Sequence, residues 1–325
     1  MKNILVVLAL PQAVRDTYRD ALHEAFPERS GVHFDVVEHH TKAGPCLDAA
    51  DAVIAFGVML SDEIFARGKR LQWAQAMGSG VDGITDQPSF RPEIHVTNMQ
   101  GLHGPPCAES ALSSMLALAR YLPRIFANQQ AAKWDRFPMR LIDGKTAVIL
   151  GLGVIAEALA PRCKAMGMRV IGVTGAPREL AGFDEVRPRS RMMDSVREAD
   201  HLILLTPYTK ENHHLVNAEM LAAMKPSSFL INIARGGVVD EDALVVALRE
   251  KRIAGASLDV FSMEPLPGEH PLWSLDNVMI TPHLAGFHDE YPQRAMPILV
   301  HNISRFLAGD FPGMINIVNP GKVSA

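Results

Sequence analysis

The chain has 325 residues, of which 48% are hydrophobic and 21% are charged, and its formal net charge is -4. This length favours two domains that each have a core, and the composition is that of a globular protein. A net negative charge argues against a protein that binds nucleic-acid phosphates, and no apolar run reaches the roughly 18 residues that a membrane span needs. We therefore expect no nucleic-acid partner and no membrane partner.

The beginning of the chain, "MKNILVVLALPQ", mimics a signal peptide because a lysine precedes an apolar run. No small-residue cleavage pattern follows it, so we interpret the run as a buried first strand. The three cysteines, Cys46, Cys107 and Cys163, are far apart and lack the paired spacing of a metal site. A reduced, cytoplasmic protein is the expected setting.

The first third of the chain alternates short β-type runs with helix-type runs such as residues 14–26. This alternation predicts βαβ units and a parallel sheet. Residues 104–130 then read as one long helix, with Pro105 and Pro106 near its start, where a missing N–H group costs least. The β-type runs of this part are residues 4–10, 33–38, 52–56, 71–77 and 94–98.

A second series of β-type runs follows the long helix. Helical stretches such as residues 240–251 separate most of these runs, and a proline-rich loop occupies residues 262–276. A final helical stretch, residues 289–307, belongs to neither series in order, so we expect it to pack on the first domain. The strands of the second series are expected in residues 146–153, 168–174, 201–207, 228–237, 254–261 and 277–283.

The stretch "GLGVIAEALA" begins at Gly151 and matches the glycine-rich turn that holds the phosphates of a dinucleotide. "TAVIL" supplies the strand before the turn and "VIAEALAPRCKAMG" the helix after it, which is the context that the motif requires. Gly151 allows the tight turn, Gly153 lets the backbone approach a pyrophosphate, and Ala156 takes the position that packs the helix on the strand.

The two series and the turn together predict the fold class. We expect an α/β protein with two doubly wound parallel-sheet domains, in which a Rossmann nucleotide-binding domain is inserted into a flavodoxin-like domain. The nucleotide-binding domain would comprise residues 99–286. The substrate domain would be discontinuous and comprise residues 1–98 and 287–325.

The loop after the second strand bears on the choice of cofactor. Sites for NAD usually have an acidic residue about 20 residues beyond the glycine turn, where it binds the ribose 2′-OH. Here Thr174 occupies that place, and Arg178 follows four residues later. A hydroxyl with a nearby guanidinium accommodates a 2′-phosphate, which favours NADP. If Arg178 lies in solvent instead, the site tolerates both cofactors.

Three polar residues follow strands of the second series. Arg235, Glu264 and His283 lie in "LINIARGGVVDEDAL", "GASLDVFSMEPLP" and "MITPHLAG". Ligands of open α/β sheets bind beyond the carboxyl ends of the strands, so these side chains are expected in one crevice. An arginine grips a carboxylate, a histidine exchanges a proton near neutral pH, and a carboxylate beside the imidazole fixes its tautomer and favours its charged form.

Over nearly its whole length, the sequence resembles the D-isomer-specific 2-hydroxyacid dehydrogenase family. The motifs that carry the resemblance are "GKTAVILGLGVI", "INIARGGVVDEDAL", "SLDVFSMEPLP", "NVMITPHLAG", "MGSGVDGI" and "LTPYTKENHHLVN". The resemblance implies an oxidoreductase that moves a hydride between NADP(H) or NAD(H) and a 2-ketoacid or D-2-hydroxyacid. Small 2-ketoacids such as glyoxylate, hydroxypyruvate or pyruvate are the expected substrates, and a bulkier or aromatic one is left open.

The resemblance also implies roles for individual residues. Arg235 would bind the substrate carboxylate and polarise the keto oxygen, and His283, held by Glu264, would protonate that oxygen. Backbone N–H groups of Gly78, Ser79 and Gly80 in the first domain would bind the carboxylate, with the cleft closing over the nicotinamide. Asp259 would accept a hydrogen bond from the nicotinamide carboxamide. The expected cofactor-binding residues are Gly151, Leu152, Gly153, Val154, Ile155, Thr174, Gly175, Arg178, Thr206, Pro207, Ile233, Ala234, Arg235, Asp259, His283, Ala285 and Gly286.

The sequence departs from the family's commoner pattern at two places. "FHDEYPQRA" follows "TPHLAG" and puts His288 and Tyr291 near the expected cleft, and "NMQGLHGPP" puts Leu102 and His103 near the substrate opening. Both departures leave the identity of the substrate open.

Other readings concern metals, partners and rival functions. The adjacent histidines at His39–His40 and His213–His214 lack a third ligand at zinc spacing, so we expect no metal site. Family resemblance implies a homodimer through the helix at residues 106–125. The rival functions are a nucleotide-sensing module like the family's transcriptional co-repressors and a 3-phosphoglycerate dehydrogenase.

Overall fold

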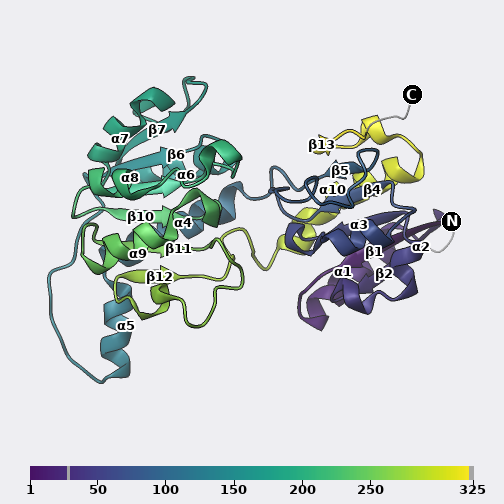
Figure 1. Ribbon diagram of the computed structural model, residues 1–325, viewed down its shortest axis with the longest axis horizontal. Coiled ribbons are helices and arrows are strands. Elements are labelled where there is room, and N and C mark those ends of the chain that lie inside the picture. Colours follow the sequence, from purple (N-terminus) through teal and green to yellow (C-terminus); the bar gives the residue numbers. More distant parts are fainter. Residues whose placement is uncertain (28–29, 322–325) are drawn as a thin grey trace. The chain divides into compact units, whose positions relative to one another are not determined.

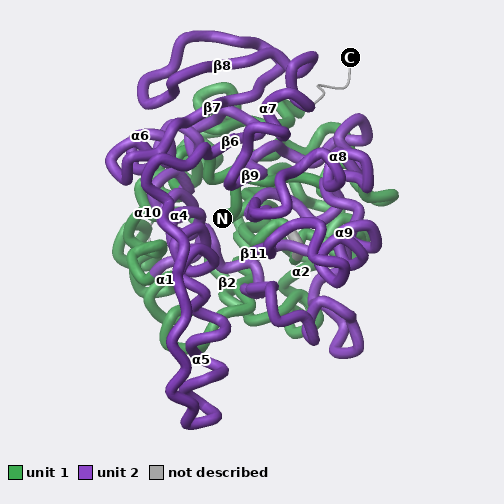
Figure 2. The backbone as a smooth tube through the Cα atoms, turned by 90° about the vertical axis from the view of Figure 1, so that its left-hand side faces the viewer, with its two compact units in different colours: residues 1–102, 289–325 green, residues 103–288 purple. Residues whose placement is uncertain are grey.

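The computed structural model describes residues 1–27 and 30–321 of the chain (Figure 1). They form two compact units (Figure 2): residues 1–102 with the chain from residue 289 onward make unit 1, and residues 103–288 make unit 2. The boundaries fall at 102/103 and 288/289, whereas the sequence placed them at 98/99 and 286/287. Among the helices of the described ranges, none combines the length and the apolar character that crossing a bilayer requires.

Unit 1 is built on a six-stranded sheet in the order β13-β5-β4-β3-β1-β2. Strands β1 to β5 run parallel, and all five coincide with β-type runs of the sequence. Their order is that of a flavodoxin-like sheet. The strands are β1 (Lys2–Val7), β2 (Val32–Val37), β3 (Ala52–Ala55), β4 (Trp73–Ala76), β5 (His95–Thr97) and β13 (Ile317–Asn319).

Helices cover both faces of this sheet, so its central strands are buried on both sides. Successive residues of β1 face opposite layers: Ile4 and Val6 belong to the core cluster with the first and last helices, and Leu5 and Val7 to the other cluster. The helices are α1 (Gln12–Ala25) and α10 (Tyr291–Leu307) on one face, and α2 (Pro45–Ala49) and α3 (Asp62–Arg67) on the other.

One strand of unit 1 was not expected from the sequence. β13 pairs with β5 in the antiparallel direction, at the edge of an otherwise parallel sheet. It has only three residues, and its side chains are exposed or half-buried, so it has no apolar alternation to reveal it. Antiparallel edge strands of this kind are common on parallel sheets.

Unit 2 contains a seven-stranded, all-parallel sheet in the order β12-β11-β10-β9-β6-β7-β8. Read from β6, this is the Rossmann order, in which the chain winds outward in both directions from the first strand. The strands are β6 (Thr146–Leu150), β7 (Arg169–Thr174), β8 (Glu185–Pro188), β9 (His201–Leu204), β10 (Phe229–Asn232), β11 (Gly255–Leu258) and β12 (Val278–Ile280).

Two core clusters lie on the two faces of this sheet. In β6, Val148 and Leu150 pack toward one cluster, and Ala147 and Ile149 toward the other. The first cluster contains side chains of α7 (Met192–Glu198), α8 (Ala218–Ala223) and α9 (Glu241–Arg249). The second contains side chains of α4 (Gly104–Ala119) and α6 (Val154–Ala165).

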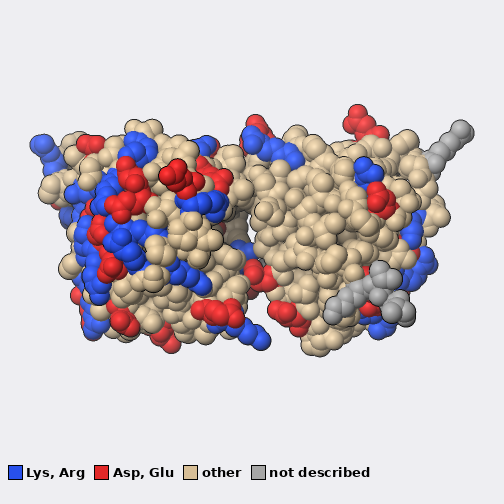
Figure 3. Space-filling view, turned by 90° about the horizontal axis from the view of Figure 1, so that it is seen from above, with Lys and Arg blue, Asp and Glu red and all other residues tan. Residues whose placement is uncertain are grey.

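The edge strand β8 was also missed from the sequence, because "EVRP" has too few apolar residues to indicate a strand. Charged side chains stabilise this edge: Arg187, with 5% of its side chain exposed, lies 2.6 Å from Glu185 and 2.7 Å from Glu198. Their hydrogen bonds to Arg187 are the main reason why the pKa values of both carboxyls are low. On the face of unit 2 in Figure 3, basic and acidic side chains are similarly interspersed.

The expected single helix over residues 104–130 is wrong. The segment forms two helices, α4 and α5 (Leu122–Gln130), with Tyr121 between them in the left-handed region at φ 53°. Pro123 explains the break, because its ring lacks an N–H group and would clash with the carbonyl of Ala119 in a continuous helix. Helix α5 stands away from the rest of unit 2 in Figures 1 and 2.

Candidate functional site

The glycine turn lies where the strand order of unit 2 reverses, between β6 and β9. Gly151 has φ +95°, and a Cβ at this position would lie 2.7 Å from the backbone nitrogen of Thr206. Its own N–H group donates to the carbonyl of Val173 over 3.1 Å. Gly151 is therefore in contact with strand β7 and with the loop that follows β9, and only glycine fits there.

Helix α6 begins directly after this turn. Gly153 is its N-cap, in extended backbone at φ -115°, and no side chain caps the N–H groups of the first turn. A Cβ built on Gly153 would meet no atom within 4 Å. An open approach to uncapped N–H groups at a helix N-terminus fits the pyrophosphate of a dinucleotide. Ala156, in the next turn, is fully buried against the sheet, as its place in the motif requires.

The next loop contains the residues that bear on cofactor choice. Thr174 is the last residue of β7, with Gly175 after it. The guanidinium of Arg178 lies 3.0 Å from a carboxylate oxygen of Glu157, which is in the first half of α6. Both side chains are about half exposed, at 51% and 46%. Arg178 is therefore beside the glycine turn. Its ion pair with Glu157 would compete with a 2′-phosphate for the same guanidinium.

Two loops converge around the predicted proton donor. Nδ1 of His283, in the loop after β12, lies 2.7 Å from Oε2 of Glu264, in the loop after β11. The other carboxylate oxygen of Glu264 accepts the N–H of Phe261 over 3.0 Å. Burial raises the pKa of Glu264, but the bonds from His283 and Phe261 and the charge of Arg235 outweigh it, so this pKa lies below its usual value. Among the described residues Nε2 of His283 has no hydrogen-bond partner, and 45% of this side chain is exposed.

Arg235 is held by a residue that the sequence reasoning missed. Asn232, the last residue of β10, is 1% exposed; its side chain accepts the N–H of Ala234 and donates to the carbonyl of Arg235, each over 3.0 Å. Ile233 and Ala234 between them are nearly buried. The signal was a polar residue at the end of an apolar strand, because a buried amide needs partners.

Asp259 is engaged in several hydrogen bonds within unit 2. Its buried carboxylate accepts hydrogen bonds from the hydroxyl of Thr281 at 2.5 Å and from the N–H groups of Leu284 and Ala285 at 2.9 Å. Its carbonyl also accepts the N–H of His283 over 2.8 Å. Because His283 has φ +54°, Asp259 holds a turn that would otherwise relax. The structure thus gives it a positioning role; the nicotinamide contact stays a prediction.

The residues after His283 pack against the start of α4. Ser110 donates to the carbonyl of Ala285 over 3.1 Å, and a Cβ on Gly286 would lie 2.6 Å from the ring of His103. His103 is therefore beside Gly286, three residues from His283. Leu102, which the sequence placed near the substrate opening, packs against the core of unit 1.

Tyr291 also belongs to the interior of unit 1. Only 1% of its surface is exposed, and its hydroxyl donates to the carbonyl of Met77. Met77 directly precedes Gly78, Ser79 and Gly80, which follow β4 and are half-buried. The sequence placed Tyr291 near the expected cleft; in the structure its side chain is buried in unit 1, next to this loop.

The remaining cofactor candidates follow β9. Thr206 is 9% exposed, and the side chain of Asn212 donates to the carbonyl of Pro207 over 3.0 Å. The positions expected to contact the cofactor in unit 2 therefore come from the loops after β6, β7, β9, β10, β11 and β12. All of these loops lie at the carboxyl ends of the strands.

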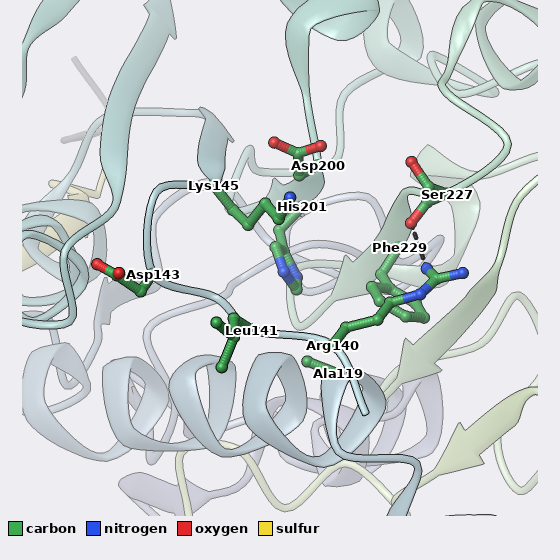
Figure 4. A pocket seen from close by; sticks show the side chains of 9 residues that line it. All are labelled: Ala119, Arg140, Leu141, Asp143, Lys145, Asp200, His201, Ser227 and Phe229. Atoms are coloured by element: carbon green, nitrogen blue, oxygen red, sulfur yellow. Dashed lines mark hydrogen bonds between the residues drawn. The ribbon is translucent and has the colours of Figure 1, made fainter. Parts of the chain in front are cut away.

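A pocket of about 400 Å³ lies at the opposite ends of the strands of unit 2, where the strands begin (Figure 4). Arg140 donates to the carbonyl of Ser227 over 2.6 Å beside it, and burial lowers the pKa of His201 to about 4. This pocket contains none of the residues predicted from the sequence. Its lining residues are Ala119, Arg140, Leu141, Asp143, Lys145, Asp200, His201, Ser227 and Phe229.

The histidine pairs form local contacts. The rings of His39 and His40 lie 4.1 Å apart, and His40 lies 3.2 Å from Glu63. The rings of His213 and His214 stack at 3.8 Å. Within residues 1–27 and 30–321, no three side chains of the metal-binding types come together.

Comparison with known proteins gives one family model that lies within unit 2 and relatives that cover most of the chain. A family model described as "D-isomer specific 2-hydroxyacid dehydrogenase, NAD binding domain" matches residues 112–285. A glyoxylate reductase of Pyrococcus furiosus is 35% identical over 282 residues, which cover 82% of this chain and 83% of the relative. A D-3-phosphoglycerate dehydrogenase of Methanocaldococcus jannaschii is 34% identical over 84% of this chain, but the match spans only 52% of that longer protein.

Solved structures resemble both units. A D-isomer specific 2-hydroxyacid dehydrogenase of Xanthobacter autotrophicus Py2, in complex with NADPH, has a TM-score of 0.80 and 30% identity, over 98% of each chain. A D-lactate dehydrogenase of Aquifex aeolicus, with NAD and lactic acid, has a TM-score of 0.85 and 26% identity, over 99% of this chain and 100% of the other. The similarity therefore extends beyond the nucleotide-binding region.

Proposed function

The chain belongs to the D-isomer specific 2-hydroxyacid dehydrogenase family, and from this membership we propose that it is an enzyme that reduces 2-ketoacids to D-2-hydroxyacids with NADPH or NADH. The observation that carries the proposal is the 2.7 Å contact between His283 and Glu264. It lies at the carboxyl edge of the sheet that also presents the glycine turn.

Different residues of the site are proposed to perform different steps of the reaction. When bound, the nicotinamide supplies the hydride that the keto carbon accepts. Arg235 grips the substrate carboxylate and polarises the keto oxygen with its planar guanidinium. His283 gives the proton to that oxygen through Nε2, because Nδ1 is engaged with Glu264. The product is a hydroxyl, formed from one hydride and one proton.

Glu264 and Asp259 act through His283. The carboxylate of Glu264 accepts a hydrogen bond from Nδ1 and so fixes the imidazole tautomer. Asp259 holds the turn in which His283 stands. We also propose that Asp259 accepts a hydrogen bond from the carboxamide of the nicotinamide, since its carboxylate retains acceptor capacity beyond the three bonds described.

The substrate carboxylate is proposed to meet a second set of donors in unit 1. These are the backbone N–H groups of Gly78, Ser79 and Gly80 in the loop after β4. Unit 1 would thus be the substrate domain and unit 2 the dinucleotide-binding domain. This assignment rests on the location of the glycine turn in unit 2.

For the cofactor we propose a preference for NADPH. Arg178→Ala is expected to weaken NADPH binding about 10-fold, because a charge-assisted hydrogen bond to the 2′-phosphate is lost, and to change NADH binding little. Glu157→Gln frees Arg178 from its partner 3.0 Å away and should strengthen NADPH binding by about two- to fivefold, the worth of an exposed ion pair. Fluorescence titration with both nucleotides measures this, and equal responses to them would contradict the role of Arg178.

The assembly is proposed to be a homodimer formed through the segment around α5. Apolar side chains of this segment are exposed in the single chain: Phe126 by 58%, Trp134 by 94%, Met139 by 42% and Leu141 by 61%. Burying such a patch against a second copy is the usual explanation for it. Light scattering should give twice the chain mass of 35.5 kDa. The cytoplasmic location stays a prediction.

A substrate screen tests the proposed function. The purified chain is assayed for NADPH and NADH oxidation with glyoxylate, hydroxypyruvate, pyruvate, 2-ketoisocaproate and phenylpyruvate. Turnover with one of them supports the proposed reductase. The best substrate indicates how large a side chain the substrate site accepts. If none of these ketoacids is reduced but 3-phosphoglycerate is oxidised, the result favours a 3-phosphoglycerate dehydrogenase. Tight nucleotide binding without any turnover would favour a nucleotide-sensing module.

A further inference from the structure

The loop at residues 77–80 is held by donors of two segments of unit 1, residues 98–99 and the start of α10. The hydroxyl of Tyr291, the first residue of α10, donates to the carbonyl of Met77. The N–H of Met99 donates to the carbonyl of Gly78 over 3.0 Å. The side-chain amide of Asn98 donates to the carbonyl of Ser79 over 2.7 Å. Three consecutive carbonyl groups are therefore all engaged.

This pattern fixes the direction of the next N–H groups. In a trans peptide the C=O and the N–H of the same unit point to opposite sides. The N–H groups of Gly78, Ser79 and Gly80 therefore point away from Tyr291, Met99 and Asn98. Among the described residues, those of Gly78 and Gly80 donate to no acceptor. Backbone N–H groups that are fixed in this way and have no internal acceptor are suited to bind an anion.

Asn98 is itself fixed in place. Its side-chain oxygen accepts the N–H of Gln100 over 3.0 Å, and its own N–H donates to the carbonyl of Asn316 over 3.1 Å. The side chain of Asn316 returns a bond to the carbonyl of Asn98 over 3.2 Å. With 6% of its surface exposed, Asn98 has no freedom to turn its amide away from Ser79.

We propose that Tyr291 and Asn98 are positioning residues of the carboxylate site: they hold the carbonyl groups of Met77 and Ser79 so that the loop's N–H groups are aligned before the substrate binds. The proposal rests on the function proposed above, in which this loop binds the carboxylate. Neither side chain touches the substrate in this role. Each acts through the peptide group that it holds, which lowers the cost of ordering the loop on binding.

Tyr291→Phe is the sharpest test because it removes one oxygen atom and keeps the ring in the core. We expect KM for the best 2-ketoacid to rise about three- to tenfold, the effect of one lost hydrogen bond to a buried group. We expect kcat and the Kd for NADPH to stay within about twofold. The Kd for oxamate, which has a carboxylate but no reducible ketone, should rise by the same factor as KM.

Tyr18→Phe is the matched control. Tyr18 lies in α1 of the same unit and is 1% exposed, and its buried hydroxyl has no hydrogen-bond partner among the described residues. Its removal should leave KM, the oxamate Kd and the melting temperature unchanged or slightly improved. Asn98→Ala is the second variant, and it should raise KM and the oxamate Kd without weakening NADPH binding.

Two results would overturn the proposal. One is an unchanged KM and oxamate Kd in Tyr291→Phe with the melting temperature of the wild type. The other is a parallel loss of NADPH and oxamate binding in both variants, which is the sign of general loosening. A wild-type protein that binds NADPH but neither reduces a 2-ketoacid nor binds oxamate would instead overturn the proposed function, and this inference with it.

Discussion

Replacing His283 with alanine is expected to lower kcat/KM for 2-ketoacid reduction by about 10²- to 10⁴-fold, the usual contribution of a positioned general acid. The Kd for NADPH should change by less than about twofold, because the glycine turn and α6 are untouched. Stopped-flow reduction and nucleotide titration of the same preparation measure the two effects separately. Equal losses of activity and of nucleotide binding would show that His283 supports the fold of the cofactor site instead.

Two further variants test whether the loss of activity comes from the loss of the proton donor itself. His283 stands at φ +54°, a conformation that asparagine tolerates better than alanine. His283→Asn therefore removes the proton donor with less backbone strain, and it should be as inactive as His283→Ala. Glu264→Gln keeps a hydrogen-bond partner for Nδ1 of His283, but the amide can present either its oxygen or its nitrogen to the ring. The tautomer of His283 is then no longer fixed, so kcat should fall while the Kd for NADPH stays unchanged.

Gly153→Ala is expected to reduce NADPH and NADH affinity by about 10- to 100-fold, because a methyl group would stand where the pyrophosphate approaches the helix and one charge-assisted hydrogen bond would be lost. The melting temperature of the free protein should not change. Gly153 has φ -115°, which alanine adopts without strain, and a Cβ there meets no atom within 4 Å. Calorimetry with each nucleotide and thermal unfolding without it provide the measurement.

The controls for this prediction come from other glycines of unit 2. A Cβ on Gly268 also meets no atom within 4 Å, so Gly268→Ala should change neither stability nor nucleotide binding. Gly151→Ala is the opposite case, since φ +95° and a backbone atom at 2.7 Å predict a loss of stability. Unchanged nucleotide affinity in Gly153→Ala would mean that the pyrophosphate does not lie at this turn.

Local sequence patterns were enough to predict the parallel strands and the glycine turn. Buried parallel strands are continuous apolar runs such as "TAVIL", and a turn at φ +95° needs glycine whatever surrounds it. The convergence of Glu264 and His283 was also predictable, because carboxyl ends of parallel strands meet at one edge. These inferences depend on residues that are close in sequence or on a general rule of the fold.

Other features depend on neighbours that only the fold supplies. β8 and β13 are strands because a free sheet edge is beside them, while their own residues do not indicate a strand. The break at Tyr121 was missed because the apolar pattern continues across Pro123.

The sequence by itself determined the parallel strands other than β8, the glycine turn, the chemical identity of the residues beyond the strands, and the family to which they point. Only the tertiary structure decided what holds those residues in place. Asp259 binds the turn of His283, and Tyr291 binds a carbonyl 214 positions away in the chain. Such hydrogen bonds leave no local pattern, since each partner is defined by where the sheet brings distant segments together.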